Sequence, residues 1–326
     1  MTLHHPTRRR LLAVGILLGL PHGPARADTD WPQRPIRIVL PYAPGGSTDA
    51  TARLVAMPMT QSLGQPVVVE NRPGATGTIG AAEVARAPKD GYTLLVDAAA
   101  HGSNHALYRN LPFDYVRDFI PISQLTVSPQ LLVVHPSLPA RTLTELVALA
   151  KKQPGELSYG TPGNGSAGHL AAAALAWHAG LDVTQVAYRG GGPAVQDLLA
   201  NQISFTFASV SASLALVQEG KLRALAVSSL NRIAPMPELP AVAETYAGFD
   251  INEWAGLYAP AGTPEPIVTK AETAARAALA LPEVRQRLDQ LGAQAIGSSR
   301  QDFAAWLARQ RASMSELVQA AGIKPD

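Results

Sequence analysis

Short apolar runs alternate with segments of helical periodicity along almost the whole chain. Apolar runs at 36–40, 67–69, 157–160 and 183–187 have the length and composition of buried strands, and each is followed by a helical segment. Strands and helices in alternation indicate sheets of parallel strands covered by helices. The pattern therefore predicts an α/β fold.

Side-chain caps mark several of the expected helix starts. Thr142 and Glu145 form a capping-box pattern before an apolar helical segment. Ser299 and Asp302 stand in the same relation before a long terminal helix, which we expect to continue to about Ala320.

Two long extended segments frame the middle of the chain. Residues 118–126, continued by 130–134, predict a strand that crosses between two lobes, and residues 250–259 predict the return crossing. We therefore expect a discontinuous protein of two α/β lobes with a cleft between them. This division assigns residues 28–127 and 251–326 to the first lobe and residues 128–250 to the second.

The first 27 residues have the pattern of an export signal. Arginines at 8–10 precede an apolar run at 11–20 that is too short to span a bilayer, and Ala-Arg-Ala at 25–27 matches a cleavage site. The paired arginines fit a twin-arginine signal, although an ordinary Sec signal fits about equally well. Either route predicts a mature chain that begins at Asp28 and leaves the cytoplasm.

Removal of this signal changes the charge balance. The whole chain has 27 basic and 25 acidic residues, and four of the basic but none of the acidic residues lie within 1–27, so the mature net charge is −2. This balance argues against nucleic acid or an anionic membrane surface as a partner. The chain has no cysteine, so its stability has to come from core burial rather than from disulfides.

Four strand-like runs end in a glycine-rich turn that opens a helix. We name them turn 1 (44–49), turn 2 (72–77), turn 3 (161–166) and turn 4 (189–193). Glycine lets a backbone approach a ligand closely, and a helix start presents unpaired N–H groups with a partial positive charge. Several such turns around one cleft would hold a small anion without lysine or arginine.

The side chains beside these turns favour a carboxylate ligand. Neutral hydrogen-bond donors stand at Ser47, Thr48, Thr76, Thr161, Asn164 and Ser166. Asp49 and Arg53 are four residues apart on the first helix, and we expect them to form a cap and an ion pair rather than a ligand contact.

Turn 3 also contains a literal G-x-G-x-x-G at 163–168, the fingerprint of dinucleotide binding. Asp182 lies near the expected distance along the chain, but it precedes the next strand, whereas the ribose-binding acid should end that strand. An exported dinucleotide-dependent enzyme is therefore only an alternative hypothesis.

Other catalytic patterns are incomplete. Asn164 replaces the first glycine of a nucleophile elbow around Ser166, and no orienting acid accompanies Ser166 and His169. His101 and His105 are four residues apart but lack a third metal ligand nearby. We expect no catalytic residue, no metal and no cofactor.

A set of segments in the mature chain resembles one known family. The segments are P-G-G-S-T-D-A-T-A-R at 44–53, V-E-N-R-P-G-A at 69–75, D-G-Y-T-L-L at 90–95, D-F-I-P at 118–121, G-N-G-S-A-G-H-L at 163–170, Y-R-G-G-G-P-A at 188–194, G-K-L-R-A-L-A-V at 220–227, and W-A-G-L with A-P-A-G-T-P at 254–264. In this order they resemble the Bug-type substrate-binding receptors, the periplasmic components of tripartite tricarboxylate transporters. The resemblance covers essentially all of the mature chain.

The resemblance implies a Venus flytrap of two lobes that holds a small carboxylate by backbone N–H groups, short hydroxyls and waters. Carried onto this sequence, with neighbouring wall positions, the ligand-binding residues are Ala43, Gly46, Ser47, Thr48, Ala75, Thr76, Ala99, His101, Thr161, Asn164, Gly165, Ser166, Arg189 and Ser209. Thr76 stands where the family often has glycine, and Ser204 and Ala208-Ser209 stand where acidic residues are common. These departures leave the identity of the ligand open.

The implied function is that of a non-enzymatic, monomeric periplasmic receptor for a small organic carboxylate. Its partners would be the integral membrane subunits of a tripartite transporter. A receptor that feeds a sensor is a second alternative, because both would use the same closing lobes.

Overall fold

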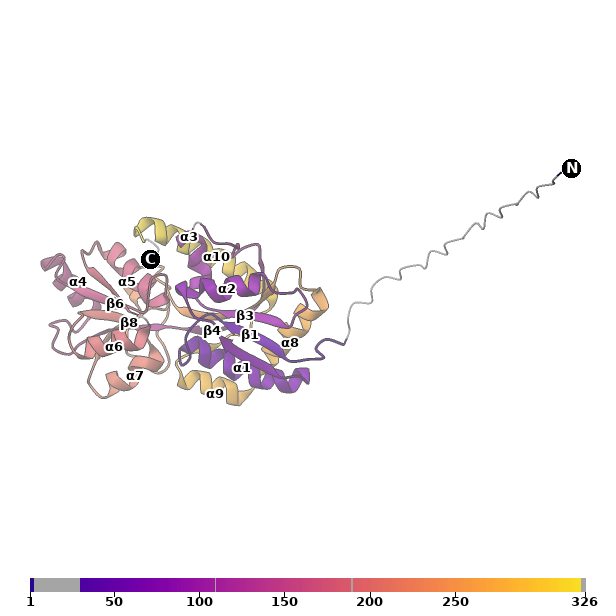
Figure 1. Ribbon diagram of the computed structural model, residues 1–326. Helices are drawn as coiled ribbons and strands as arrows, with labels where there is room; N and C mark the ends of the chain where they lie inside the picture. The colour runs from indigo at the N-terminus through magenta and orange to yellow at the C-terminus, as the bar shows by residue number, and fades with distance from the viewer. Residues whose placement is uncertain (3–29, 109, 189, 324–326) are drawn as a thin grey trace.

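The computed structural model describes residues 1–2, 30–108, 110–188 and 190–323. The predicted export signal from residue 3 onward, its cleavage site and Arg189 lie outside the described residues. Figure 1 shows two α/β lobes side by side, joined near the middle of the molecule. The chain leaves the first lobe, builds the second, and returns.

The first lobe is built on a mixed sheet of order β11-β4-β10-β3-β1-β2. Its strands are β1 (Ile36–Leu40), β2 (Val67–Asn71), β3 (Thr93–Asp97), β4 (Phe119–Ser128), β10 (Glu253–Pro260) and β11 (Gln294–Ala295). Its helices are α1 (Ser47–Leu63), η1 (Ala75–Gly77), α2 (Thr78–Ala85), α3 (Ala100–Leu107), α8 (Glu265–Ala280), α9 (Pro282–Gln290) and α10 (Arg300–Ala320).

Strand periodicity divides the first lobe into two core layers. Ile38 and Leu40 of β1 point into a core with α1, α8 and α9, whereas Val39 points into a core with α2 and α10. Figure 1 shows α1 and α9 on one side of the sheet and α2, α3 and α10 on the other. Both faces of the sheet are therefore covered, which is why its strands are continuous apolar runs.

The second lobe repeats this plan on a sheet of order β7-β6-β8-β5-β9. Its elements are β5 (Gln130–Val134), α4 (Leu143–Lys152), β6 (Ser158–Thr161), α5 (Ala167–Ala179), β7 (Thr184–Ala187), α6 (Gly191–Leu199), β8 (Phe205–Ser209), α7 (Val210–Gln218), β9 (Arg223–Val227) and η2 (Val242–Glu244). Leu132 and Val134 face α4 and α5, and Leu131 and Val133 face α6 and α7.

Both sheets are mixed, so the expected parallel pairing holds for part of each sheet. β1 pairs in parallel with β2 and β3, and β6 with β7 and β8. One crossing strand in each sheet runs the other way: β10 is antiparallel to β3 and β4, and β5 is antiparallel to β8 and β9. A chain that enters and leaves each lobe through its sheet has to insert such reversed strands.

The predicted crossing strands are confirmed, and they lie close together. β4 ends at Ser128 and β5 begins at Gln130, so only Pro129 separates a strand of one sheet from a strand of the other. The return passes from β9 to β10. Ser228 Oγ accepts a hydrogen bond from Gln130 N at 2.9 Å and lies 3.1 Å from Asn252 Oδ1, which ties the two crossings together.

α10 forms a third connection between the lobes. The predicted cap is present, since Ser299 Oγ accepts a hydrogen bond from Asp302 N at 3.1 Å. Phe303 lies in the first lobe's core, but Met314 and Leu317 lie in the second lobe's core. The assignment of all of 251–326 to the first lobe therefore does not describe the last turns of α10.

The most apolar helix is short and enclosed. α5 buries ten of its thirteen residues inside the second lobe. Within the described part of the chain, no helix is both long enough and apolar enough to cross a membrane.

Candidate functional site

The carboxyl ends of the parallel strands in both sheets meet at the crossing between the lobes. In the first lobe, β1 and β3 end beside the start of β10, where Glu253 pairs with Ser128. In the second, β6 ends at Thr161, and Ser209 at the end of β8 pairs with Gln130. Open α/β sheets bind ligands at this edge. We call the two facing edges and their turns the lobe junction.

Turns 1 and 2 are held together by one amide side chain. Asn71 Nδ2 donates to the carbonyl of Tyr42 at 3.0 Å and to Asp49 Oδ1 at 2.9 Å. Asp49 also accepts from Gly45 N and pairs with Arg53 at 3.0 Å. The expected ion pair of Asp49 is thus confirmed, but the expected cap is not, because Asp49 accepts from Gly45 N before the helix and α1 has no side-chain cap. Sequence reasoning did not single out Asn71, whose partners lie on two other segments.

Turn 2 contacts α3, and α3 contacts turn 3 across the lobes. Asn104 Nδ2 donates to the carbonyl of Thr76 at 2.9 Å, and Ser103 Oγ donates to the carbonyl of Gly165 at 3.3 Å. Gly165 has φ +75°, and a Cβ there would lie 2.8 Å from Leu107 Cδ1. Glycine is therefore required both by the backbone and by the close approach of the lobes.

The backbone of turn 2 is strained where the sequence departs from glycine. Ala75 and Thr76 both have positive φ, at 44° and 50°. For a β-branched residue this region is costly, of order 1 to 3 kcal/mol, and such strain gathers at functional sites. The contacts of turn 2 at the lobe junction therefore hold Ala75 and Thr76 in a backbone conformation that these residue types disfavour.

The starts of α1, α6 and α7 lie at the lobe junction and have no side-chain cap among the described residues. α1 follows Gly46, α6 follows Gly190 and α7 follows Ser209, and none of these residues caps its helix through a side chain. Pro162 of turn 3 is the neighbour of the α6 start, 3.9 Å from a Cβ placed on Gly191. The first N–H groups of such helices attract anions.

The start of α5 is satisfied from within turn 3. Ser166 Oγ donates to the carbonyl of Gly163 at 2.7 Å and accepts from His169 N at 3.3 Å, while Gly165 N donates to His169 Nδ1 at 3.0 Å. The hydroxyl proton of Ser166 is therefore already used in this geometry. Its role here is that of a helix cap.

The turn after β3 is likewise satisfied by protein groups. Ala99 N donates to Glu253 Oε1 at 3.0 Å, so this N–H is occupied. Asp97 accepts from Tyr42 Oη at 2.7 Å and Ala98 N at 2.8 Å. His101 Nδ1 lies 2.9 Å from the other oxygen of Asp97.

His101 is enclosed rather than part of an exposed wall. Its side chain is 0% exposed and stacks on Tyr258, with ring centroids 4.1 Å apart. Burial lowers the pKa of His101, so the ring is neutral and donates from Nδ1 to Asp97. His101 therefore supports the junction from behind.

Glu253 is a residue of the lobe junction that sequence reasoning did not single out. It is partly exposed at the start of β10, and burial, with the charge of Asp97, raises its pKa to about 7. The signal in the sequence was an acid at the start of a crossing strand. Only the fold shows that this acid reaches a helix start 154 residues earlier in the chain.

The remaining predicted positions divide by exposure. Ala43 and Gly46 are exposed, Ser47 is partly exposed, and Thr48 is buried, with 8% of its surface exposed. Thr161 is 0% exposed and its Oγ1 accepts only a long bond of 3.4 Å from Gln185. Ser209 is partly exposed, with its hydroxyl 3.2 Å from that of Ser211.

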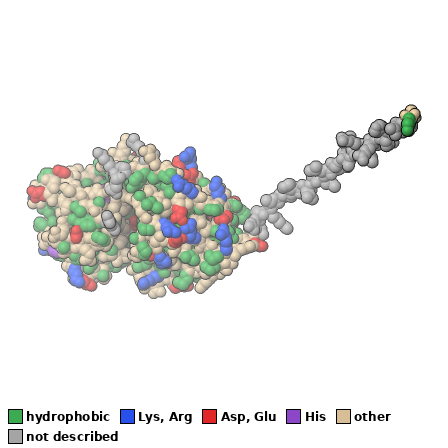
Figure 2. All heavy atoms as spheres, viewed as in Figure 1, with side chains coloured by type: hydrophobic (Ala, Val, Ile, Leu, Met, Phe, Trp, Pro, Cys, Tyr) green, Lys and Arg blue, Asp and Glu red, His purple; other side chains and the backbone are tan. Residues whose placement is uncertain are grey.

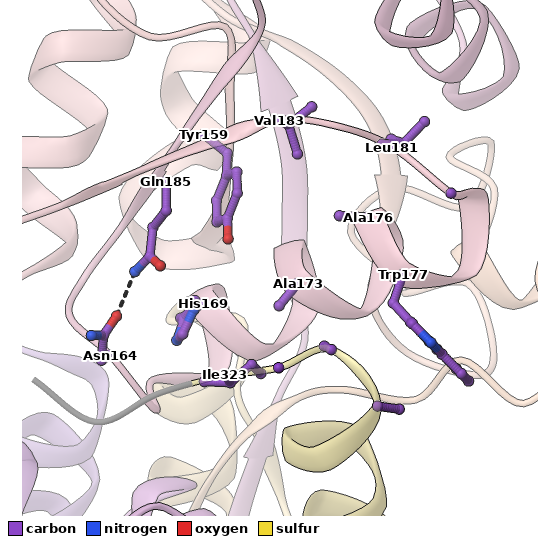
Figure 3. Close-up of a pocket in the computed structure, with 14 residues that line it drawn as sticks. Tyr159, Asn164, His169, Ala173, Ala176, Trp177, Leu181, Val183, Gln185 and Ile323 are labelled. Atoms are coloured by element: carbon purple, nitrogen blue, oxygen red, sulfur yellow. Dashed lines mark hydrogen bonds between the residues drawn. The ribbon is translucent and has the colours of Figure 1, made fainter. Parts of the chain in front are cut away.

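A pocket of about 620 Å³ lies in the second lobe beside turn 3. Its lining includes Tyr159, Asn164, Trp177 and Gln185 from the lobe, and Ile323 after the end of α10. Figure 3 shows Gln185 and Asn164 pointing toward each other, with Gln185 Nε2 donating to Asn164 Oδ1. The pocket thus shares Asn164 with turn 3.

The geometry removes the support for a dinucleotide site. Asp182 precedes β7, and its carboxylate lies 3.5 Å from a Cβ placed on Gly155, at the end of the sheet away from turn 3. Among the described residues, no three His, Cys, Asp or Glu side chains form a group able to hold a metal.

Comparison with known proteins identifies one family. The model of the tripartite tricarboxylate transporter family receptor matches residues 51–323. Protein BugT of Bordetella pertussis is 38% identical over 265 residues, which cover 79% of this chain and 81% of BugT.

Two solved structures with bound carboxylates are similar throughout. The R. palustris protein Rpa4515 with adipate is 35% identical, with a TM-score of 0.84 over 91% of this chain and 100% of that one. MatC of Rhodopseudomonas palustris with bound malate is 33% identical, with a TM-score of 0.80 over 88% and 100%. These relatives are solute-binding receptors, not enzymes.

Proposed function

This chain belongs to the receptor family of the tripartite tricarboxylate transporters, and we propose that it binds a small organic carboxylate at the lobe junction. The family and the fold of its relatives indicate a periplasmic location. We further propose that export removes residues 1–27 and that the loaded receptor delivers its ligand to membrane subunits.

The start of α1 is the observation that carries this proposal. Gly46 provides no side-chain cap, and the hydroxyls of Ser47 and Thr48 make no hydrogen bond to any described residue. Backbone N–H groups and two hydroxyls therefore remain for a ligand, together with the helix dipole. By contrast, the starts of α3 and α5 are already occupied by protein atoms.

The ligand's carboxylate would lie against α1, with turn 2 beside it. From the other lobe, the uncapped starts of α6 and α7 and the residues of turn 3 would close over the ligand. Helix ends alone supply about 0.3 to 2 kcal/mol each, whereas micromolar affinity requires about 8 kcal/mol. Charge-assisted hydrogen bonds in a closed junction would supply the remainder.

A calorimetric titration of the mature chain tests this proposal. Adipate, malate and a series of mono-, di- and tricarboxylates serve as probes, with melting temperature as a second readout. Thr48→Ala should weaken binding by about 1.5 to 3 kcal/mol, the range for a hydrogen bond to a charged group. Thr273→Ala, on the exposed side of α8, is the matched control.

Two results would count against the site. One is equal affinity of Thr48→Ala and the unaltered chain for a carboxylate that binds. The other is the absence of binding and of thermal stabilisation by every carboxylate tested.

A further inference from the structure

Glu253 brings a carboxylate to the lobe junction from the return crossing. It is the first residue of β10 and pairs with Ser128, the last residue of β4, at the point where β4 leaves the first lobe and β10 enters it. The neighbouring strand β3 ends at Asp97, and α3 begins just beyond it. Glu253 therefore stands between the sheet edge and the helix that contacts turn 3.

The two carboxylate oxygens of Glu253 have different surroundings. Oε1 accepts from Ala99 N at 3.0 Å and from Trp254 N at 3.2 Å, which fixes the orientation of the carboxylate. Oε2 has no donor within hydrogen-bond distance among the described residues, and it is not one of the enclosed atoms left without a partner. The second oxygen is therefore open at the junction.

No described cation neutralises this oxygen. On β3 and α3 the facing groups are Asp97, an acid whose oxygens are already satisfied, and the neutral ring of His101. Tyr42, after β1, donates its hydroxyl to Asp97. On β4 the register partner is Ser128, and on α10 Arg311 is bound to the carbonyl of Tyr115. Among the described residues, the open oxygen therefore has no hydrogen-bond donor.

We propose that Glu253 determines ligand specificity by accepting a hydrogen bond from an N–H group of the ligand. This inference rests on the carboxylate site proposed above. The ligand would be a carboxylate that carries an amide or ammonium group away from α1, rather than a simple dicarboxylate. A second carboxylate at that point would meet the open oxygen of Glu253, and two such oxygens repel unless they share a proton.

Protonation of Glu253 should relax this preference. Because its pKa is about 7, the side chain is mostly ionised at pH 8 and mostly protonated at pH 6. The protonated form has a hydroxyl to donate, so a dicarboxylate gains a partner as the pH falls. Discrimination against dicarboxylates should accordingly be strongest at pH 8.

Matched probes of equal length test the proposal. Succinate is compared with succinamate and 4-aminobutanoate, and adipate with adipamate and 6-aminohexanoate, by calorimetry at pH 8. The unaltered chain should prefer a probe with an N–H group by about tenfold or more. Glu253→Gln keeps an oxygen for Ala99 N but replaces the open oxygen by an NH₂ group, so it should reverse the preference.

The remaining outcomes separate the two proposals. Glu238→Gln, an exposed carboxylate-to-amide change in the second lobe, should leave the preference unchanged. Carboxylate binding with the same order of preference in Glu253→Gln and the unaltered chain would overturn the role of Glu253 alone. Failure of all probes to bind the unaltered chain would overturn the carboxylate site as well.

A measurement on the unaltered chain covers the case in which Glu253→Gln does not fold. The ratio of the succinamate to the succinate affinity should fall by about tenfold between pH 8 and pH 6. A ratio that does not change with pH would refute the proposal.

Discussion

The two lobes share one plan but handle charge differently. In the first lobe, Asp49, Asp97 and Glu253 stand at the junction and accept backbone N–H groups of their own lobe. In the second lobe, the corresponding positions are the neutral residues Thr161 and Ser209. Figure 2 shows the same contrast on the visible surface, where charged side chains gather mainly on the first lobe.

This difference determines which helix starts have N–H groups available for a ligand. Acids of the first lobe occupy the start of α3 and brace turn 1, but they leave the start of α1 uncapped. In the second lobe, Ser166 caps the start of α5, whereas the starts of α6 and α7 have no side-chain cap. A carboxylate placed between the lobes would thus meet positive helix ends on both sides, and Glu253 is the acid of the first lobe that keeps an oxygen open to it.

The largest expected loss of stability comes from adding a side chain at Gly165, where turn 3 of the second lobe contacts α3 of the first lobe. Gly165→Ala puts a side chain at φ +75° and 2.8 Å from Leu107, so it should destabilise the fold by about 2 to 5 kcal/mol. Gly46→Ala is the control, because Gly46 has φ −79° and no atom within 4 Å of an added Cβ. Urea denaturation measures both, and equal stability of the two variants would show that the lobes do not meet at Gly165.

The next effect concerns the segment that belongs to both lobes. Leu317→Ala should destabilise the protein by about 2 to 3 kcal/mol, since the buried Leu317 packs in the second lobe's core. Hydrogen exchange should increase in β6 more than in β1. The exposed neighbour Gln319→Ala is the control, and greater exchange in β1 would place the end of α10 with the first lobe.

A smaller effect depends on pH. The pKa of Glu253 is raised from 4.5 to about 7, so the folded chain retains a proton that the unfolded chain releases between these values. Stability therefore falls as the pH rises through this interval. Glu253→Gln should remove that loss, so it should raise the free energy of unfolding by about 1 to 2 kcal/mol at pH 8 and not at pH 4. The expected rise is smaller than the full pKa shift would give, because Glu253 is partly exposed to solvent. Thermal melts of both chains from pH 4 to pH 8 measure this effect. A stability difference between the two chains that does not change with pH would contradict the prediction.

The smallest effect distinguishes a cap from a ligand contact. Ser166→Ala removes a cap of α5 and should cost about 1 kcal/mol of stability. Thr48→Ala removes no described hydrogen bond, so it should change ligand affinity more than stability. Melting curves and calorimetry on both variants would show the reverse pattern if Ser166 contacts the ligand and Thr48 does not.

The sequence by itself determined the features that depend on neighbouring residues. Ser299 and Thr142 cap the helices that their spacing predicts, because a cap joins residues three apart. The crossing strands and the glycine turns also follow from local composition. Together with the family resemblance, these features were enough to predict two α/β lobes and a non-enzymatic receptor.

Only the tertiary structure decided which of these groups remain free for a ligand. Ser166 is used within its own turn, His101 lies behind Asp97, and Glu253 reaches the start of α3. It also reversed the direction of β5 and β10 and placed the end of α10 in the second lobe. Hydrogen-bond partners more than a hundred residues apart leave no periodicity or spacing in the chain, so only the packing of the sheets and helices determines them.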